Sequence, residues 1–198
     1  MINASDHVEL IREVFRYTQA FQEKTFVLQV DDAILLRPTV ASLMRDVVLL
    51  HRTGIRIVLV AGARRRIDDI LERYNVSSEK HHGVRISTPD AIPFIKMAAF
   101  DAANRVMTSL AGHGVNAVIG NWVRARSMGV LDGVDFQDAG MVDRISVDLL
   151  RGVIDQGSIP ILPCIGWSAA GKPYNISSRA LATELASSLQ ASKLFFLA

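Results

Sequence analysis

Two junctions between a strand and a helix combine residue types that could bind an anion. The segments 27–33 and 58–67 each begin as an apolar strand and continue through a turn into a helical pattern. Backbone N–H groups at the start of a helix attract negative charge, so such junctions are typical of phosphate or carboxylate sites. In the second junction, Gly62, Ala63 and Arg64 could bind such an anion. A tight turn followed by three solvated arginines is an equally good interpretation.

The first junction departs from this pattern. Asp31 and Asp32 occupy the turn where a loop that binds phosphate needs small, uncharged residues. Two carboxylates at this place would repel a nucleotide. We therefore interpret the chain as a phosphate-binding type of scaffold that has lost phosphoryl chemistry.

Two further side chains are candidates for binding a ligand. Arg85 lies between apolar residues beside Gly83, where a guanidinium could bind a carboxylate with two hydrogen bonds. A surface arginine on a hairpin is the alternative. Asn175 precedes a helical pattern and could donate to a ligand oxygen, or it could serve the local turn.

Other chemistry finds little support in the sequence. His81 and His82 have no partner at a spacing typical of metal ligands, so we assign no metal site. No arrangement of Ser, His and Asp indicates a catalytic residue. The single cysteine, Cys164, excludes an internal disulfide and lies in an apolar strand end, which favours a buried structural thiol in a reducing compartment.

Composition indicates one globular α/β domain rather than a disordered, membrane or nucleic-acid-binding protein. The 198 residues are 49% hydrophobic with a formal net charge of +2, and the basic residues are scattered apart from 64–66. No apolar run is long enough to span a membrane, and the N-terminus has no signal-peptide pattern. We expect a cytoplasmic protein that binds neither nucleic acid nor membrane.

The hydrophobic pattern predicts alternating helices and strands. Helices are expected at 5–20, 38–54, 64–74, 88–111, 146–156 and 178–190, and strands at 25–30, 55–60, 115–119, 158–163 and 193–197. Glycines punctuate 121–145 in a way that is typical of β-hairpins, and 164–177 is expected to be a loop. This order predicts a three-layer αβα sandwich with a mainly parallel sheet and protruding β-hairpins.

The order of several motifs resembles the amino acid kinase family. These motifs are the segments 54–64, 83–88, 120–122, 129–135 and 171–176. Within this family the chain is similar to the N-terminal, kinase-like domain of bacterial N-acetylglutamate synthases. The resemblance covers nearly the whole chain, and it rests on the order and spacing of the motifs together.

The resemblance implies a domain organisation. Residues 1–22 would form an N-terminal helix that serves oligomerisation, and residues 23–198 a kinase-like domain. The chain ends on an apolar strand, so we expect it to be truncated before the rest of that domain and before an acetyltransferase domain. Synthases of this kind are implied to be hexamers with interlaced N-terminal helices.

The resemblance also identifies positions at which kinase chemistry is lost. In the kinases a lysine before a Gly-Gly turn handles ATP phosphates; here Gln29 stands at the lysine, and Asp31 and Asp32 stand at the glycines. A catalytic aspartate of the kinases falls on Arg179. Phosphoryl transfer depends on such charges, so kinase activity is not expected. The pocket formed by Gly62, Ala63, Arg85 and Asn175 would then be vestigial.

The function implied is regulatory. In such synthases the kinase-like domain binds the effector L-arginine, and Tyr17 and Phe21 could form one wall of that site. Acetyl-CoA would be a substrate of the parent enzyme, with no cofactor in this segment. Two alternatives stay open: an active N-acetylglutamate kinase, and a stand-alone sensor that binds an amino acid.

Overall fold

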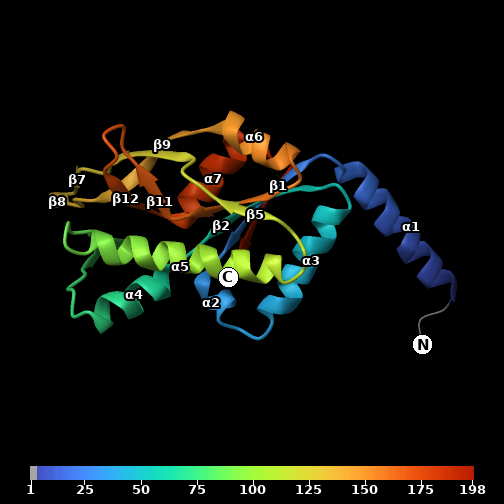
Figure 1. Ribbon diagram of the computed structural model, residues 1–198, viewed down its shortest axis with the longest axis horizontal. Coiled ribbons are helices and arrows are strands. Elements are labelled where there is room, and N and C mark those ends of the chain that lie inside the picture. The colour runs from blue at the N-terminus through green and yellow to red at the C-terminus, as the bar shows by residue number, and fades with distance from the viewer. Residues whose placement is uncertain (1–3) are drawn as a thin grey trace.

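The computed structural model describes residues 4–198, which form a three-layer sandwich (Figure 1). Its helices are α1 (Ala4–Phe21), α2 (Asp32–Leu35), α3 (Val40–Arg52), α4 (Arg64–Arg73), α5 (Ile92–Ala111), α6 (Val147–Asp155) and α7 (Ser178–Ser188). The strands of the main sheet are β1 (Thr25–Val30), β2 (Arg56–Ala61), β5 (Ala117–Ile119), β10 (Ile159–Pro163) and β13 (Lys193–Leu197). They pair in the order β13-β1-β2-β10-β5, and every pair is parallel.

Alternation along the central strands divides the interior into two cores. In β1, Phe26 and Leu28 face one side of the sheet, whereas Val27 faces the other. All three side chains are at most 5% exposed. Because successive residues of a strand point to opposite faces, a strand covered on both sides is apolar along nearly its whole length.

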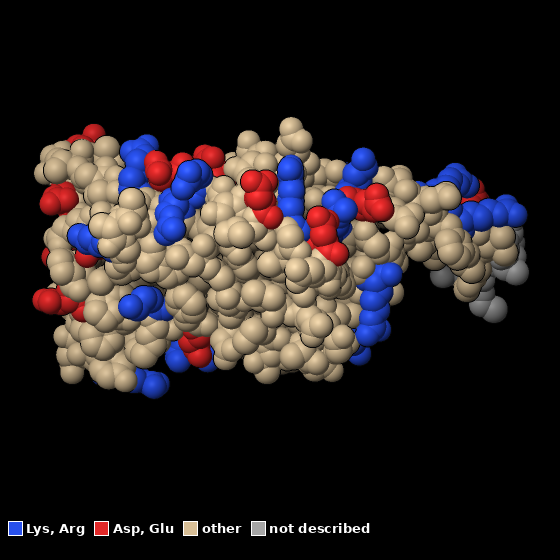
Figure 2. Space-filling view, turned by 45° about the horizontal axis from the view of Figure 1, so that its top comes forward, with Lys and Arg blue, Asp and Glu red and all other residues tan. Residues whose placement is uncertain are grey.

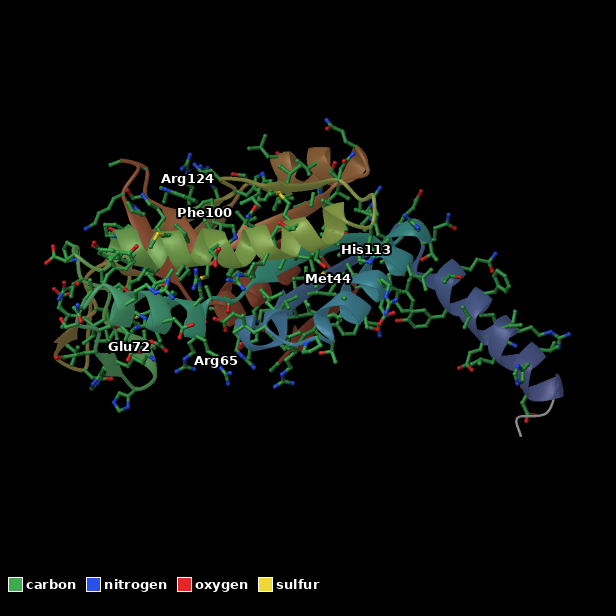
Figure 3. The ribbon with its side chains drawn as sticks, turned by 60° about the horizontal axis from the view of Figure 1, so that its bottom comes forward. Met44, Arg65, Glu72, Phe100, His113 and Arg124 are labelled. Carbon is green, nitrogen blue, oxygen red and sulfur yellow. The ribbon has the colours of Figure 1, made fainter. Side chains whose placement is uncertain are left out.

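Helices cover both faces of the sheet. Helices α3, α4 and α5 lie on one side and α6 and α7 on the other (Figure 1). Met44 of α3 is directed into the first core, whereas Arg65 of α4 lies at the outer surface (Figure 3). The expected fold is therefore confirmed.

A smaller β structure adjoins the carboxyl ends of β1 and β2. Strands β6 (Val123–Ser127), β9 (Ala139–Ile145), β12 (Pro173–Ile176) and β11 (Ile165–Trp167) form a closed four-stranded ring. Two small hairpins, β3 (Lys80–His81) with β4 (Val84–Arg85) and β7 (Val130–Leu131) with β8 (Val134–Asp135), lie beside it. The hairpins expected in 121–145 are present.

One local expectation was wrong. The segment 164–177 contains the antiparallel pair β11 and β12, where a loop was expected. Gly166 permits the close packing of β11, because a Cβ at this position would lie only 2.7 Å from Ala125 Cβ. A glycine within a strand weakens the sequence signal for that strand, so the pattern indicated a loop. The short helix α2 follows the turn after β1, as the pattern of 27–33 predicted, and it begins where Asp31 caps it.

Helix α1 extends away from the sandwich (Figures 1 and 2). Its base is attached through Phe21, whose ring centroid lies 5.3 Å from that of Phe26. Beyond the base, Val8, Ile11, Val14 and Phe15 form an apolar stripe along the helix and are 46 to 69% exposed. Within the described chain this stripe has no core to pack against.

Candidate functional site

A cavity of about 230 Å³ lies where β1 and β2 end, bounded by the β3–β4 hairpin and the start of α7. It brings together most of the residues singled out from the sequence. The lining includes Gln29, Asp31, Gly62, Ala63, Arg64, Arg85, Asn175 and Arg179. Segments separated by as many as 150 positions thus meet at the carboxyl ends of the central parallel strands, where α/β proteins commonly bind ligands.

Gly62 allows the two turns to approach each other. Its N–H donates to the carbonyl of Val30 over 2.8 Å, which continues the pairing of β1 with β2. A Cβ at this position would lie 3.1 Å from Gln29 Nε2 and 3.1 Å from the Val30 carbonyl. Close packing between the turns therefore favours glycine, because a Cβ would require its neighbours to shift by a few tenths of an ångström.

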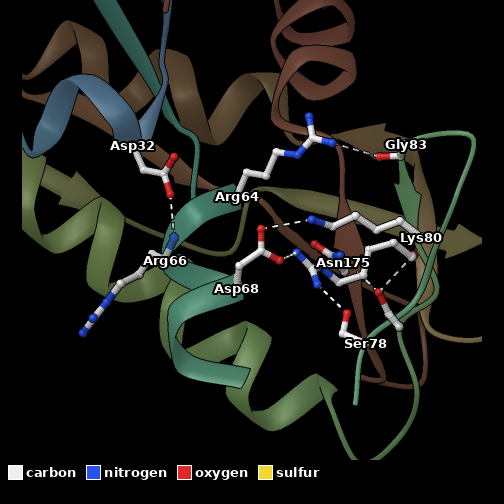
Figure 4. Close-up of polar contacts among 10 residues, drawn as sticks. Asp32, Arg64, Arg66, Asp68, Ser78, Lys80, Gly83 and Asn175 are labelled. Carbon is white, nitrogen blue, oxygen red and sulfur yellow. Dashed lines mark hydrogen bonds and ion pairs between the residues drawn. The ribbon is translucent and has the colours of Figure 1, made fainter. Parts of the chain in front are cut away.

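Asp32 supplies an anion to the start of α4. Its Oδ2 accepts a hydrogen bond from the backbone N–H of Arg66 over 2.7 Å, and the residue is only 4% exposed (Figure 4). Burial, and to a smaller extent Asp31, raise the pKa of Asp32, although the backbone N–H groups of Arg66 and Arg65 act in the opposite direction. The position expected to repel a nucleotide thus points towards α4, and Asp32 is not among the residues that line the cavity.

Asp31 has a different environment. Its Oδ1 accepts a hydrogen bond from Ala33 N over 3.0 Å, so its side chain caps α2. Unlike Asp32, Asp31 lines the cavity and is only partly buried. The cavity therefore has a carboxylate at the end formed by β1.

Gln29 lies beside this carboxylate in the lining of the cavity. The residue is 1% exposed, and its Nε2 donates to Ser178 Oγ over 3.4 Å. Its Oε1 is buried without a hydrogen-bond partner among the described residues. A buried carbonyl oxygen in this condition is costly unless a ligand or water donates to it.

Arg85 is buried, so the alternative of a surface arginine on a hairpin was wrong. Its guanidinium donates to a carboxylate oxygen of Asp68 and to the hydroxyl of Ser78 (Figure 4). The other oxygen of Asp68 accepts from Lys80 Nζ over 3.0 Å. Part of the fork expected to bind a ligand is therefore used inside the protein.

The pKa of Asp68 reflects this cluster. Burial alone would raise it, but the hydrogen bonds and charges of Arg85 and Lys80 outweigh burial and lower the pKa. The sequence analysis missed Asp68, because nothing in a helical Asp68-Asp69 pair indicates which carboxylate faces a hairpin twelve or more residues away.

Asn175 does not serve its local turn. Its Nδ2 donates to the hydroxyl of Ser87 over 3.1 Å, which joins β12 to the segment that precedes α5. Near this bond, the buried carboxylate of Asp138 pairs with Lys172, on the connection between β11 and β12. The sequence did not indicate Ser87 or Asp138, because their side-chain partners, Asn175 and Lys172, come from distant segments of the chain.

The sequence analysis also singled out Arg179, Tyr17 and Phe21, and each of these side chains lies beside an aromatic ring. Arg179, at the rim of the cavity, lies over the ring of Phe196 with 5.2 Å from Cζ to the ring centroid. Tyr17 and Phe21 lie before the amino end of β1, whereas the cavity lies at its carboxyl end, and their ring centroids are 4.5 Å apart. They do not belong to the cavity.

Cys164 is buried as expected, and burial raises the pKa of its thiol to about 12. Such a thiol stays protonated and is a poor nucleophile. Among the described residues, no group of three or more His, Cys, Asp or Glu side chains could hold a metal ion. None of the helices in 4–198 is both long and apolar enough to cross a membrane.

Comparison with known proteins identifies the class of fold that this site belongs to. The sequence model of the amino acid kinase family matches residues 24–198, so the chain belongs to that family. It is similar to the amino-acid acetyltransferase of Edwardsiella ictaluri, with 34% identity over 96% of this chain and 45% of the relative.

Solved structures show the same relationship. The N-acetylglutamate synthase of Neisseria gonorrhoeae complexed with coenzyme A and N-acetyl-glutamate superposes with a TM-score of 0.88 and 32% identity, over 96% of this chain and 45% of that protein. The same synthase complexed with coenzyme A and L-arginine matches with a TM-score of 0.88 and 31% identity, over 96% and 47% respectively. The chain spans slightly less than half the length of these proteins.

Proposed function

We propose that this chain is the regulatory, kinase-like part of an N-acetylglutamate synthase and is itself not catalytic. The parent protein would transfer the acetyl group of acetyl-CoA to L-glutamate through a separate acetyltransferase domain, in the first step of arginine biosynthesis in the cytoplasm. L-arginine would bind to the kinase-like domain as effector. The Neisseria synthase complexed with L-arginine supports this assignment.

The observation that carries the non-catalytic role is the charge at the end of the cavity formed by β1. A kinase needs positive charge beside the transferred phosphoryl group, because negative charge spreads over the phosphoryl oxygens in the transition state. Here the cavity has a neutral carboxamide, Gln29, and a carboxylate, Asp31. The carboxylate opposes binding of the polyphosphate of ATP, and the carboxamide supplies none of the positive charge that a lysine would.

Arg179 contributes to the same argument. Where the resemblance to the kinases places a catalytic aspartate, this chain has a cation that lies over Phe196. A guanidinium cannot organise Mg²⁺ as a carboxylate does. Recovery of phosphoryl transfer would thus require other residues to supply both missing functions.

The effector site is proposed at the base of α1. Tyr17 and Phe21 would form one wall, and Lys193 lies with its Nζ 5.2 Å from the centre of the Phe21 ring. The opposite wall would come from chain that follows residue 198 in the parent protein. On this proposal, the isolated chain binds arginine more weakly than the parent does.

Two assays test the proposed function. Incubation of the chain with ATP, Mg²⁺ and N-acetyl-L-glutamate is expected to yield no ADP at high protein concentration, whereas steady ADP production would establish the kinase alternative. Thermal unfolding of the parent protein in series of L-arginine and L-lysine is expected to show stabilisation by arginine only. A flat response to arginine would exclude the sensing role.

A further inference from the structure

The β3–β4 hairpin belongs to neither of the larger β structures. Within the described chain its strands pair only with each other, and a hairpin of this size is marginally stable at best on its own. It nevertheless forms one wall of the cavity, through Lys80, Gly83, Val84 and Arg85. From its attachment to α4 we propose that this hairpin is a lid on the cavity, and that Asp68 is the latch that keeps the lid closed.

One face of α4 supplies the polar contacts to the lid. Arg64 and Asp68 are four positions apart on this helix, so their side chains lie on the same face. Asp68 accepts from Lys80 and from Arg85, and Arg64 donates to the carbonyl of Gly83 over 3.5 Å (Figure 4). These contacts join α4 to both strands of the hairpin and to its turn.

Asp68 determines whether the charges in this cluster attract or repel. Lys80 and Arg85 lie directly opposite each other in the hairpin, a position in which like charges are destabilising. Among the described residues, Asp68 is the only carboxylate that forms an ion pair with either of them. Without it, Lys80 and Arg85 would repel each other and Arg64 as well. Loss of this one charge therefore changes the interaction between the lid and α4 from attraction to repulsion.

Apolar packing contributes little to closure of the lid. Val84 is the one apolar side chain of residues 80–85, and it is 38% exposed. His81 is half-buried, with its ring centroid 6.1 Å from that of Phe136. A segment with so few buried apolar contacts opens more readily than the cores of the sandwich, so the ionic contacts decide its position.

Distances between two spin labels measure the position of the lid. One label is placed on the lid by Val84→Cys and the other on an exposed position of α7 by Glu184→Cys. The native Cys164 is buried and its thiol has a pKa of about 12, so it stays unlabelled. We expect one short distance in the chain with Asp68 intact. Asp68→Asn is expected to add a longer distance and to increase the open population at least about tenfold.

Two further variants separate loss of the latch from loss of any charge. Asp69→Asn makes the same chemical change on an exposed side chain of α4 and should leave the distance unchanged. Lys80→Met removes the repulsion opposite Arg85 but leaves Arg85 paired with Asp68, so the lid is expected to stay closed. Near-UV circular dichroism of each variant checks that the sandwich is intact.

Salt gives a second test, with a response of opposite sign in two proteins. Raising the ionic strength from about 0.01 M to about 1 M shortens the Debye length from about 30 Å to about 3 Å. With Asp68 intact, salt weakens an attraction and should increase the open population. In Asp68→Asn, salt weakens a repulsion and should decrease it. The first of these series tests the latch without any substitution at Asp68.

Several results would overturn the proposal. They are a single short distance in Asp68→Asn, an equal effect of Asp69→Asn, no effect of salt on the chain with Asp68 intact, and a salt response of the same sign with and without Asp68. None of these measurements involves L-arginine or acetyl-CoA, so the lid and the function proposed above are tested separately.

Discussion

The carboxylate of Asp32 lies 2.7 Å from the backbone nitrogen of Arg66 and caps the start of α4 from a turn that is 34 positions earlier in the chain. A helix start in this position of an α/β fold can bind a ligand anion. In this chain a buried side chain supplies the negative charge. Its carboxylate is largely desolvated, and that gives the first prediction.

Asp32→Asn is expected to raise the thermal stability of the chain at neutral pH. Asparagine keeps an oxygen for the Arg66 N–H and removes a buried charge. Because the folded-state pKa of Asp32 is raised, its contribution to stability is present below the unfolded value of 3.8 and is lost as pH rises through the folded-state pKa. Melting temperatures from pH 4 to 8 should therefore show an advantage of the variant that grows with pH. A less stable variant at pH 7 would contradict this account.

The Asp68 cluster gives a prediction of opposite sign. Asp68→Asn leaves the buried Arg85 without its carboxylate and should cost about 1–2 kcal/mol, a figure reduced because the Asp68 side chain is 45% exposed. Its pKa is lowered, so this stabilisation is present above the unfolded value of 3.8 and is lost as pH falls through the folded-state pKa. Urea unfolding at pH 7 and pH 3 measures both effects.

The matched control for Asp68 is Asp155→Asn, which breaks an ion pair with Arg56 in which both side chains are exposed. Such pairs contribute little, so the change should stay within about 0.5 kcal/mol. If both variants cost the same, Arg85 does not depend on Asp68.

Substitution of two glycines by alanine should change the stability of the chain in opposite directions. A Cβ on Gly140 would lie 2.6 Å from Tyr174 Cβ and 3.0 Å from the Arg126 carbonyl, so Gly140→Ala should destabilise the chain by about 1–3 kcal/mol. Gly152 lies within α6 with open space around its Cβ position, and Gly152→Ala should stabilise by about 0.5–1 kcal/mol. Chemical denaturation measures both, and a stabilising Gly140→Ala would show that the four-stranded ring is more loosely packed.

The exposed stripe of α1 predicts self-association. Phe15 is 69% exposed and Ile11 is 54% exposed. Placing a charge at either position by Phe15→Glu or Ile11→Glu should reduce the oligomer measured by sedimentation velocity. Ala20→Glu, on the opposite side of the helix, should leave the oligomer unchanged. An equal effect of all three variants would indicate loss of helix rather than loss of an interface.

The layers of the fold could be predicted from the sequence, but the hydrogen bonds and ion pairs within the site could not. Apolar runs such as 25–30 and 55–60 predicted the parallel strands because burial on both faces leaves a strong local signal. The capping of α4 by Asp32, the pairing of Arg85 with Asp68 and the bond between Asn175 and Ser87 all join distant segments. No local pattern encodes such partners.

The gathering of Gly62, Arg85 and Asn175 was nevertheless predictable through the resemblance, which fixed their order along a known topology. The resemblance could not show that Arg85 forms an ion pair with Asp68, or that Asp32 does not line the cavity. Both depend on the packing of α4 against its neighbours.

The most direct test of the account measures the release of CoA from acetyl-CoA and L-glutamate by the full native gene product, with and without L-arginine, beside the same assay on these 198 residues. The account predicts activity in the full product that responds to arginine, and no activity in the 198-residue chain. CoA release by the chain alone, or a full product without acetyltransferase activity, would contradict its assignment as the regulatory part of a synthase.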